Sequence, residues 1–169
     1  MPSIYTRSGD SGTTCLYPGT HVNKADKLVS LLGEIDELVV RIGSLRLKHD
    51  QQELESIQSQ LMSLMSWIAI PEKGHHNEKQ KKVKLYRPNV QDIEISIDSR
   101  TNTLKLDSFI FPFSKFHLCR TQTRKCERKF WKLFPEEKLW GTYLNRLSDL
   151  FFAMAISEEP TSKWRHPAF

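Results

Sequence analysis

The first residues able to do chemistry form a glycine- and hydroxyl-rich run near the N-terminus. Residues 5–14 read YTRSGDSGTT, with Gly9 and Gly12 set among serine and threonine hydroxyls. Glycines let the backbone turn its N–H groups inward, so such a run can form a concave site for a phosphate group. Arg7 and Lys24 could supply positive charge beside it. The run lacks the G-x-x-x-x-G-K-[ST] pattern of a Walker loop, and a plain turn is the alternative interpretation.

A second set lies in the C-terminal half, where arginines recur every four residues. Arg120, Arg124 and Arg128 would stack on one face of a helix. Like charges at this spacing cost about 0.2–0.5 kcal/mol per pair, which is recovered when the face meets carboxylates or a polyphosphate. A solvated basic face is the alternative on this pattern alone.

Polar residues also interrupt two apolar helical patterns. Asn145 and Asp149 are one turn apart between Tyr143 and Met154, and buried polar groups there need partners. Acidic residues lie among aliphatic ones farther upstream: Glu34, Asp36 and Glu37. This acidic segment and the arginine-bearing helix could therefore pair, within one chain or between chains.

Hydrophobic periodicity predicts the elements that must position these residues. Apolar residues at three- and four-residue steps predict four amphipathic helices: residues 25–48, 51–70, 114–134 and 140–157. Residues 90–104 fit either a strand of alternating isoleucines or a helical face. Residues 72–88 are polar and lysine-rich, and residues 1–20 are rich in glycine, so both are expected to be loops. Long helices with short connections favour an all-α bundle.

Composition limits the class of protein. The 169 residues, 38% apolar and 27% charged, favour one globular domain. A net charge of +5 suggests an anionic ligand without specifying nucleic acid. No C-x-x-C pair occurs among Cys15, Cys119 and Cys126, which argues against a zinc site or a disulfide framework. No run reaches membrane-spanning length, so we expect a cytoplasmic chain.

Four sequence blocks together point to a family. They are IYTRSGDSGTT from residue 4, NKAD from residue 23, GEIDEL from residue 33, and CR to ER at 119–128 followed by YLNRLSD from residue 143. FIFP at 109–112 is a fainter match. With these blocks the chain resembles the PduO-type (human MMAB-like) ATP:cob(I)alamin adenosyltransferases over nearly its whole length.

The resemblance implies a fold, an assembly and an activity. It implies a five-helix bundle that forms a homotrimer with sites between subunits. Each chain would be a single domain, residues 1–169, with an ATP-binding loop at 1–24, the bundle at 25–157 and a tail at 158–169. The reaction would move the 5′-deoxyadenosyl group of ATP to cob(I)alamin and release triphosphate, with Mg²⁺ as cofactor and a flavoprotein reductase as partner.

The resemblance also implies roles for individual residues. The ATP contacts on the N-terminal loop would be Thr6, Arg7, Ser8, Gly9, Thr14, Cys15 and Lys24. The helical segment that grips ATP and Mg²⁺ would supply Arg124, Lys125, Cys126, Glu127 and Arg128, together with Asn145. Glu127 would be the carboxylate on the metal side. Asp36 and Arg120 would form a salt bridge across the subunit boundary, and Phe109 would displace the lower ligand of cobalamin. The residues expected to act in catalysis are Phe109, Asp36, Arg120 and Arg124.

The chain departs from the family pattern mainly on the cobalamin side. The segment from Pro112 to His117 is shorter than the family's, beside the expected corrin pocket. His21 and Val39 also replace more usual residues, and RKCER replaces RRAER at 124–128. One competing interpretation is therefore a protein that holds ATP or cobalamin without turnover. The other is a helical nucleic-acid or interaction module that uses the basic stripe.

Overall fold

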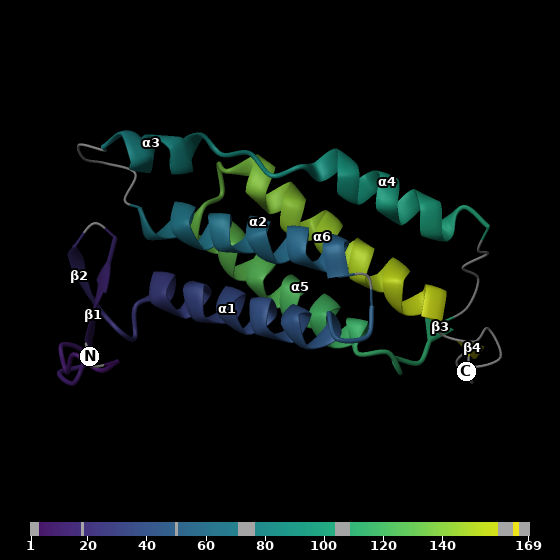
Figure 1. Ribbon diagram of the computed structural model, residues 1–169, viewed down its shortest axis with the longest axis horizontal. Coiled ribbons are helices and arrows are strands. Elements are labelled where there is room, and N and C mark those ends of the chain that lie inside the picture. Colours follow the sequence, from purple (N-terminus) through teal and green to yellow (C-terminus); the bar gives the residue numbers. More distant parts are fainter. Residues whose placement is uncertain are drawn as a thin grey trace.

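Long helices run side by side along the molecule, and a small strand pair lies at each end (Figure 1). The computed structural model describes residues 4–17, 19–49, 51–70, 77–103, 109–158 and 164–165. The described helices are α1 (Lys27–Leu45), α2 (Gln51–Ala69), α3 (Glu78–Leu85), α4 (Val90–Thr101), α5 (Phe116–Leu133) and α6 (Lys138–Glu158). The described strands are β1 (Thr13–Leu16), β2 (Thr20–Asn23), β3 (Phe109–Ile110) and β4 (Trp164–Arg165).

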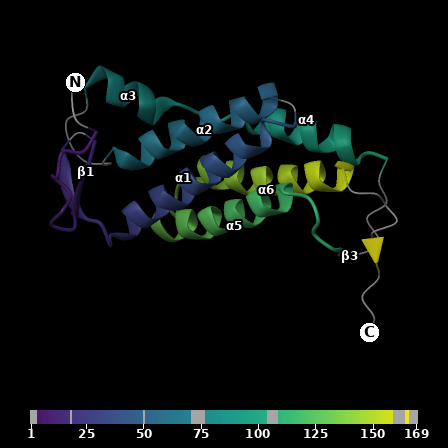
Figure 2. The same ribbon diagram turned by 60° about the horizontal axis from the view of Figure 1, so that its bottom comes forward.

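Five of these helices form the bundle, because each carries an apolar stripe that needs a partner. α1 packs against both α2 and α5, and α6 packs against both α5 and α4. Figure 2 shows α1, α5 and α6 running along one another. The buried stripe of α1 has the predicted three- and four-residue steps: Leu31, Ile35, Leu38, Ile42 and Leu45. The prediction of an all-α, five-helix bundle is confirmed. No helix in the described ranges combines the length and the apolar character needed to cross a bilayer.

The centre of the bundle is filled by large apolar side chains from α5 and α6. They include Phe130, Trp140, Tyr143, Leu144, Leu147 and Phe151, each at most 1% exposed. Burying one such side chain contributes about 1.5–3 kcal/mol. The two helices approach closely at Gly141, where an added Cβ would lie 2.2 Å from a ring carbon of Trp131.

The loop prediction for residues 72–88 is wrong at α3. Asn77 caps this helix by accepting a hydrogen bond from the backbone of Gln80, and the Gln80 side chain accepts one from the backbone of Asn77. This reciprocal pair is a capping box, and its N-x-x-Q pattern was readable in the sequence. Lys84 then fixes α3 onto α2, because its ammonium group donates to the carbonyl of Trp67 at 2.9 Å.

The segment with two possible structures, residues 90–104, is helical from Val90 to Thr101. Ile93 is buried against the bundle, whereas Ile95 is 60% exposed. The burial follows the helical face and not the alternation of isoleucines. Leu104, also part of that expected face, lies outside the described residues.

The N-terminal region is more ordered than the loop predicted for residues 1–20. β1 and β2 pair as an antiparallel hairpin in which Thr13 faces Asn23 and Leu16 faces Thr20. Gly12 and Gly19 have φ of 80° and 116°, a region that favours glycine, so they form the turns before and within the hairpin. Asp26 then caps α1 by accepting from the backbone N–H of Leu28 at 2.7 Å.

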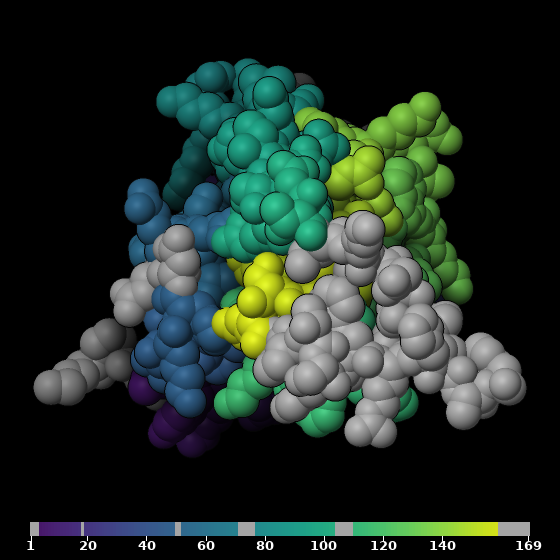
Figure 3. Space-filling view, turned by 90° about the vertical axis from the view of Figure 1, so that its right-hand side faces the viewer, coloured from purple at the N-terminus to yellow at the C-terminus, as the bar shows by residue number. Residues whose placement is uncertain are grey.

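The second strand pair lies at the opposite end of the bundle. β3 and β4 are antiparallel, with Phe109 facing Arg165 and Ile110 facing Trp164. Figure 3 looks onto this end, where the last turn of α6 (yellow) lies below α4 and above the segment that enters α5.

Candidate functional site

The N-terminal loop and Lys24 come together as the sequence predicted. An added Cβ at Gly9 would lie 2.9 Å from Nζ of Lys24, so the lysine amine lies directly over this glycine. The backbone fixes the arrangement, because Gly12 N–H donates to Gly9 O at 3.2 Å and Lys24 N–H donates to Gly12 O at 2.9 Å. A cation over a glycine turn is a suitable place for a phosphate group.

The remaining loop residues surround this turn on the exposed side. Thr6 and Ser8 share a hydrogen bond between their hydroxyls at 2.8 Å. Arg7 has φ of 59°, an uncommon conformation for a residue other than glycine, and its guanidinium lies 5.5 Å from the ring centre of Tyr5. Such backbone strain is characteristic of functional loops. Thr6, Arg7 and Ser8 are all exposed, so their hydroxyl and guanidinium donors lie on the surface.

A cavity of about 490 Å³ begins where the loop becomes β1. Its walls come from β1, α1, α2 and α3. The lining includes Thr14 and Cys15 and is otherwise mainly apolar: Leu16, Val29, Leu32, Met65, Ala69 and Val83. A concave, mostly apolar site of about 300–1,000 Å³ with a few polar groups is typical of small-molecule binding. The sequence missed this cavity because one wall is α3, which was expected to be a loop.

The outer face of α5 carries two kinds of cation, those in an ion pair within the chain and those without one. Lys125 and Lys129 each lie 2.7 Å from a carboxylate oxygen of Glu34, and Gln122 donates to the same carboxylate at 2.8 Å. Within the described chain, Arg124 and Arg128 are exposed and have no ion pair. Among the described residues of α5, the two arginines and the exposed Lys132 are therefore cations available to an anionic ligand.

The carboxylate of Glu34 has a strongly lowered pKa. Partial burial raises its pKa, but hydrogen bonds from Lys125, Lys129 and Gln122 outweigh this and lower the pKa to about 2. The sequence placed Lys125 among the ATP contacts, whereas the structure engages it with Glu34 in the same chain.

The predicted ATP contact at Cys126 needs correction. Its side chain is completely buried, and burial raises the pKa of the thiol to about 12. An un-ionised thiol inside the core cannot reach a nucleotide on the surface of α5. We therefore assign Cys126 to core packing.

Glu127 and Asn145 lie in contact across α5 and α6. Asn145 Nδ2 donates to a carboxylate oxygen of Glu127 at 3.2 Å, and Arg146 donates to Asn145 Oδ1 at 3.0 Å. Arg146 in turn pairs with Glu94 of α4 at 2.9 Å. The sequence had identified Glu127 and Asn145 but missed the support from Arg146 and Glu94, because nothing in the pattern showed which way α4 faces.

The expected pair of Asp36 and Arg120 is not formed within one chain. Arg120 Nε donates to His117 Nδ1 at 3.3 Å, and its guanidinium lies 5.9 Å from the ring centre of Phe152. Asp36 is exposed and has no ion pair among the described residues. Its partner, if it is Arg120, has to come from another copy of the chain.

The region assigned to cobalamin is only partly described. The backbone of Phe109 lies in β3, but its side chain is outside the described part, so the role predicted for it is untested. In the shortened Pro112–His117 segment, Phe113 is 64% exposed, whereas Phe116 and His117 are buried.

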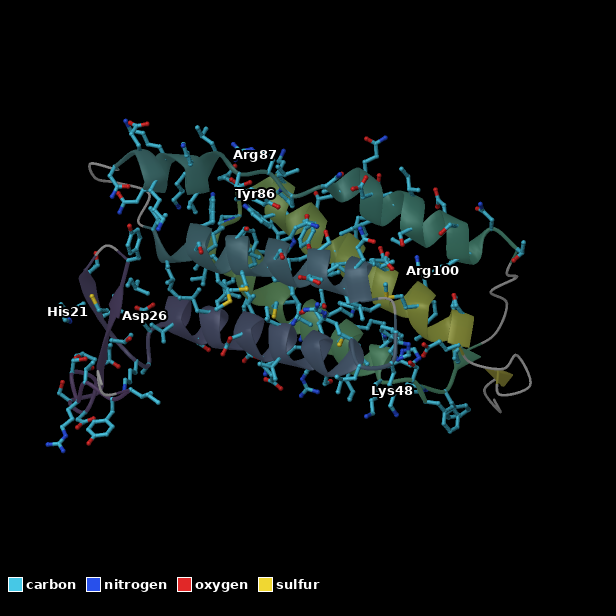
Figure 4. The ribbon with its side chains drawn as sticks, viewed as in Figure 1. His21, Asp26, Lys48, Tyr86, Arg87 and Arg100 are labelled. Carbon is cyan, nitrogen blue, oxygen red and sulfur yellow. The ribbon has the colours of Figure 1, made fainter. Side chains whose placement is uncertain are left out.

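The parts of the predicted site can be placed along the length of the bundle. The hairpin is at one end, where Figure 4 labels His21 and Asp26, and Lys48 and Arg100 mark the other end. Glu34, which the α5 lysines contact, lies eight residues beyond the Asp26 cap, or about 12 Å along the helix axis. Lys129, the neighbour of Arg128, donates to Ser30 at 2.9 Å. Ser30 is four residues beyond the Asp26 cap, so this end of the arginine row lies about 6 Å from the cap along the axis of α1.

A helical bundle with a lysine amine over a glycine turn at one end and exposed arginines along one helix has the groups needed to bind a polyphosphate. The sequence model of the family described as cobalamin adenosyltransferase matches residues 4–158. The chain belongs to the cobalamin adenosyltransferase family.

Named relatives agree along almost the entire chain. A corrinoid adenosyltransferase of Citrobacter freundii is 34% identical over 95% of this chain and 97% of its own length. Human corrinoid adenosyltransferase MMAB is 31% identical over 92% of this chain and 68% of its own length. The PduO protein of Salmonella typhimurium is 31% identical, and the chain spans about half of that protein, or 50%.

Solved structures give the same fold. A phenylalanine-to-alanine variant of a PduO-type ATP:corrinoid adenosyltransferase from Lactobacillus reuteri, complexed with cobalamin and ATP, superimposes with a TM-score of 0.81. The identity is 28%, and 99% of each chain is covered. A lysine-for-arginine variant of the same organism's enzyme, complexed with ATP, gives a TM-score of 0.77 at 30% identity, covering 90% of this chain and 92% of that one.

Proposed function

We propose that this chain transfers the 5′-deoxyadenosyl group of ATP to cob(I)alamin and releases triphosphate. The observation that carries the proposal is the lysine amine of Lys24 over Gly9, next to a cavity of nucleoside size. Family membership and relatives named corrinoid adenosyltransferases support the same reaction.

ATP would lie along the N-terminal hairpin. Its phosphates would meet the Gly9 turn, Lys24 and the donors at Thr6, Arg7 and Ser8. The nucleoside would enter the apolar cavity past Thr14 and Cys15. The phosphate-binding turn and the cavity are adjacent along β1. Thr13 pairs with Asn23, the residue before Lys24, and the next residue, Thr14, lines the cavity.

The arginine row would complete this site from a neighbouring chain. A leaving triphosphate needs cations at fixed positions, and Arg124 and Arg128 are exposed on α5 with no ion pair among the described residues. We propose a homotrimer in which the loop of one subunit and the arginine row of its neighbour meet at the subunit boundary. An Asp36–Arg120 bridge across the same boundary would fix the register.

Mg²⁺ would bind with the nucleotide rather than to the protein alone. The described residues contain no group of three or more His, Cys, Asp or Glu that could hold a metal. Mg²⁺ commonly uses one or two carboxylates together with substrate phosphates, and Glu127 supplies one such carboxylate. Asn145 donates a hydrogen bond to one carboxylate oxygen of Glu127, which would orient the other carboxylate oxygen toward the ion. The ion would neutralise charge on the departing triphosphate.

The chemistry requires placement more than a protein nucleophile. The cobalt(I) electron pair would form the bond to the 5′ carbon, while the carbon–oxygen bond breaks and its electron pair leaves with triphosphate. The protein would hold both substrates in line and stabilise the leaving group. We propose that Phe109, carried by β3, excludes the lower cobalt ligand, and that a flavoprotein reductase supplies the electrons.

The free thiols fit a reducing compartment, so we also propose a cytoplasmic location. The single-domain division into residues 1–24, 25–157 and 158–169 likewise forms part of the proposal.

An anaerobic assay tests the function. Chemically reduced cobalamin and Mg-ATP are mixed with the protein, and adenosylcobalamin and triphosphate are measured together. Equal amounts of the two products would support the transferase. ATP binding without either product would favour the competing binding protein, and salt-sensitive binding to polyanions without preference for ATP would favour the nucleic-acid module.

The nucleoside position can be tested by filling the cavity. Val83→Trp places a large ring in the cavity wall and should raise KM for ATP at least tenfold, which needs a loss of only about 1.4 kcal/mol. The KM for cobalamin should stay the same. Ile95→Trp is the matched control, because Ile95 is exposed on α4. Unchanged ATP kinetics in Val83→Trp would show that the adenine base does not bind in this cavity.

A further inference from the structure

One carboxylate at the end of α6 joins three segments of the chain. Glu158 Oε1 lies 2.7 Å from Nδ1 of His49, which follows α1. Ser114, just before α5, donates its hydroxyl to Glu158 Oε2 at 3.2 Å. The three residues are therefore in contact at the C-terminal end of α6. We name Glu158, His49 and Ser114 the latch.

The position of this carboxylate is electrostatically unfavourable without a partner. Glu158 is the last residue of α6, where the helix dipole is negative and disfavours an anion. The imidazole of His49 offsets this cost, and its ring packs on Phe116 with centroids 4.7 Å apart. Ser114 also accepts from the backbone N–H of Phe116 at 3.2 Å, so the latch is tied into the start of α5.

Two further charged groups of the same cavity are paired with each other. Arg100 and Glu53 line the same small cavity of about 160 Å³, and they bind each other at 2.6 Å. Among the described residues that line this cavity, His49 is therefore the partner of the Glu158 carboxylate.

The latch lies where both strands of the second sheet leave the bundle. Ser114 follows β3 by four residues, and Glu158 precedes β4 by six. Since β3 and β4 pair with each other, one bond between Ser114 and Glu158 restrains both arms of the sheet. β3 carries Phe109, so the restraint acts on the segment assigned to the cobalt face.

We propose that the latch is a positioning device that sets the location of β3, and with it Phe109, relative to the bundle. The expected effect on turnover with cobalamin rests on the proposed function. The expected effect on the position of β3 does not. Glu158, His49 and Ser114 act through β3 and are positioning residues.

Two variants test the catalytic consequence. Glu158→Gln removes the charge and Ser114→Ala removes the bond between the arms. Each should lower kcat/KM for cobalamin about tenfold, the effect of one lost hydrogen bond to a charged group, while KM for ATP stays within about twofold. The electron paramagnetic resonance spectrum of bound cob(II)alamin should show more of the form that keeps its nitrogen lower ligand. Glu136→Gln is the control, because Glu136 is exposed in the turn before α6.

Hydrogen exchange tests the structural consequence without relying on activity. Amides in residues 109–116 should exchange faster in Glu158→Gln and Ser114→Ala, while those of β1 and β2 stay unchanged. Unchanged exchange in residues 109–116 would overturn the inference, as would equal losses in ATP and cobalamin kinetics. A wild-type protein that makes no adenosylcobalamin but passes the exchange test would instead refute the proposed function alone.

Discussion

At the scale of single residues, burial and ion pairing distinguish the cations of α5 that are bound within the chain from those that are exposed and unpaired among the described residues. Arg124 and Lys125 are neighbours in the sequence and both exposed, yet only Lys125 is bound by Glu34. The sequence could identify the basic helix but not this division, because the division depends on how α1 is rotated against α5. Cys126 shows the same limit, since a motif position shared with a ligand-binding segment is here part of the core.

Glu34→Gln should lower the free energy of unfolding by about 1–2 kcal/mol at pH 7, allowing for solvent around the lysines. The folded pKa of Glu34 is lowered from 4.5 to about 2, so its stabilisation is complete above pH 4.5 and disappears as the pH falls to 2. Urea unfolding at several pH values measures this. Glu37→Gln is the control, because its pair with Arg41 is exposed and should contribute less than about 1 kcal/mol. A difference between wild type and Glu34→Gln that is independent of pH would contradict the assignment.

At the scale of elements, the sequence predicted the helices whose apolar stripes are long and regular. α1, α2, α5 and α6 agree with expectation to within a few residues, because their stripes persist over four or more turns. α3 was missed because its eight residues bury little and are held by a cap and by Lys84. The hairpin was missed because glycine content indicates turns without indicating what lies between them.

The contact between α5 and α6 gives a prediction at this scale. Gly141→Ala should destabilise the fold by about 1–3 kcal/mol, because the new methyl group would overlap the Trp131 ring. Gly33→Ala is the control, since nothing lies within 4 Å of a Cβ there. In the interior of α1 it should stabilise the helix by about 0.5–1 kcal/mol. Thermal unfolding of both variants measures the difference, and equal shifts would argue against close packing at Gly141.

At the scale of the whole molecule, the helical bundle holds the N-terminal hairpin and β3 apart. α1 has 19 residues and spans about 28 Å, with the hairpin at one end and β3 at the other. The order of motifs along the sequence could not reveal this separation, because motifs far apart in sequence are as free to meet as to lie apart. The apolar cavity is likewise a product of four elements and of no single motif.

The distance between the hairpin and β3 within one chain allows a test with mixed subunits. If each active site combines the nucleotide-binding half of one chain with the cobalamin-binding half of its neighbour, two inactive variants with defects in different halves can complement each other in a mixed trimer. Lys24→Ala and Phe109→Ala chains, inactive separately, should regain about a quarter of wild-type turnover when refolded as an equal mixture, since random trimers then contain one intact site in three whenever both chains are present. Adenosylcobalamin formation by the mixture measures the recovery, and a mixture as inactive as its components would mean that each chain builds its reaction centre alone.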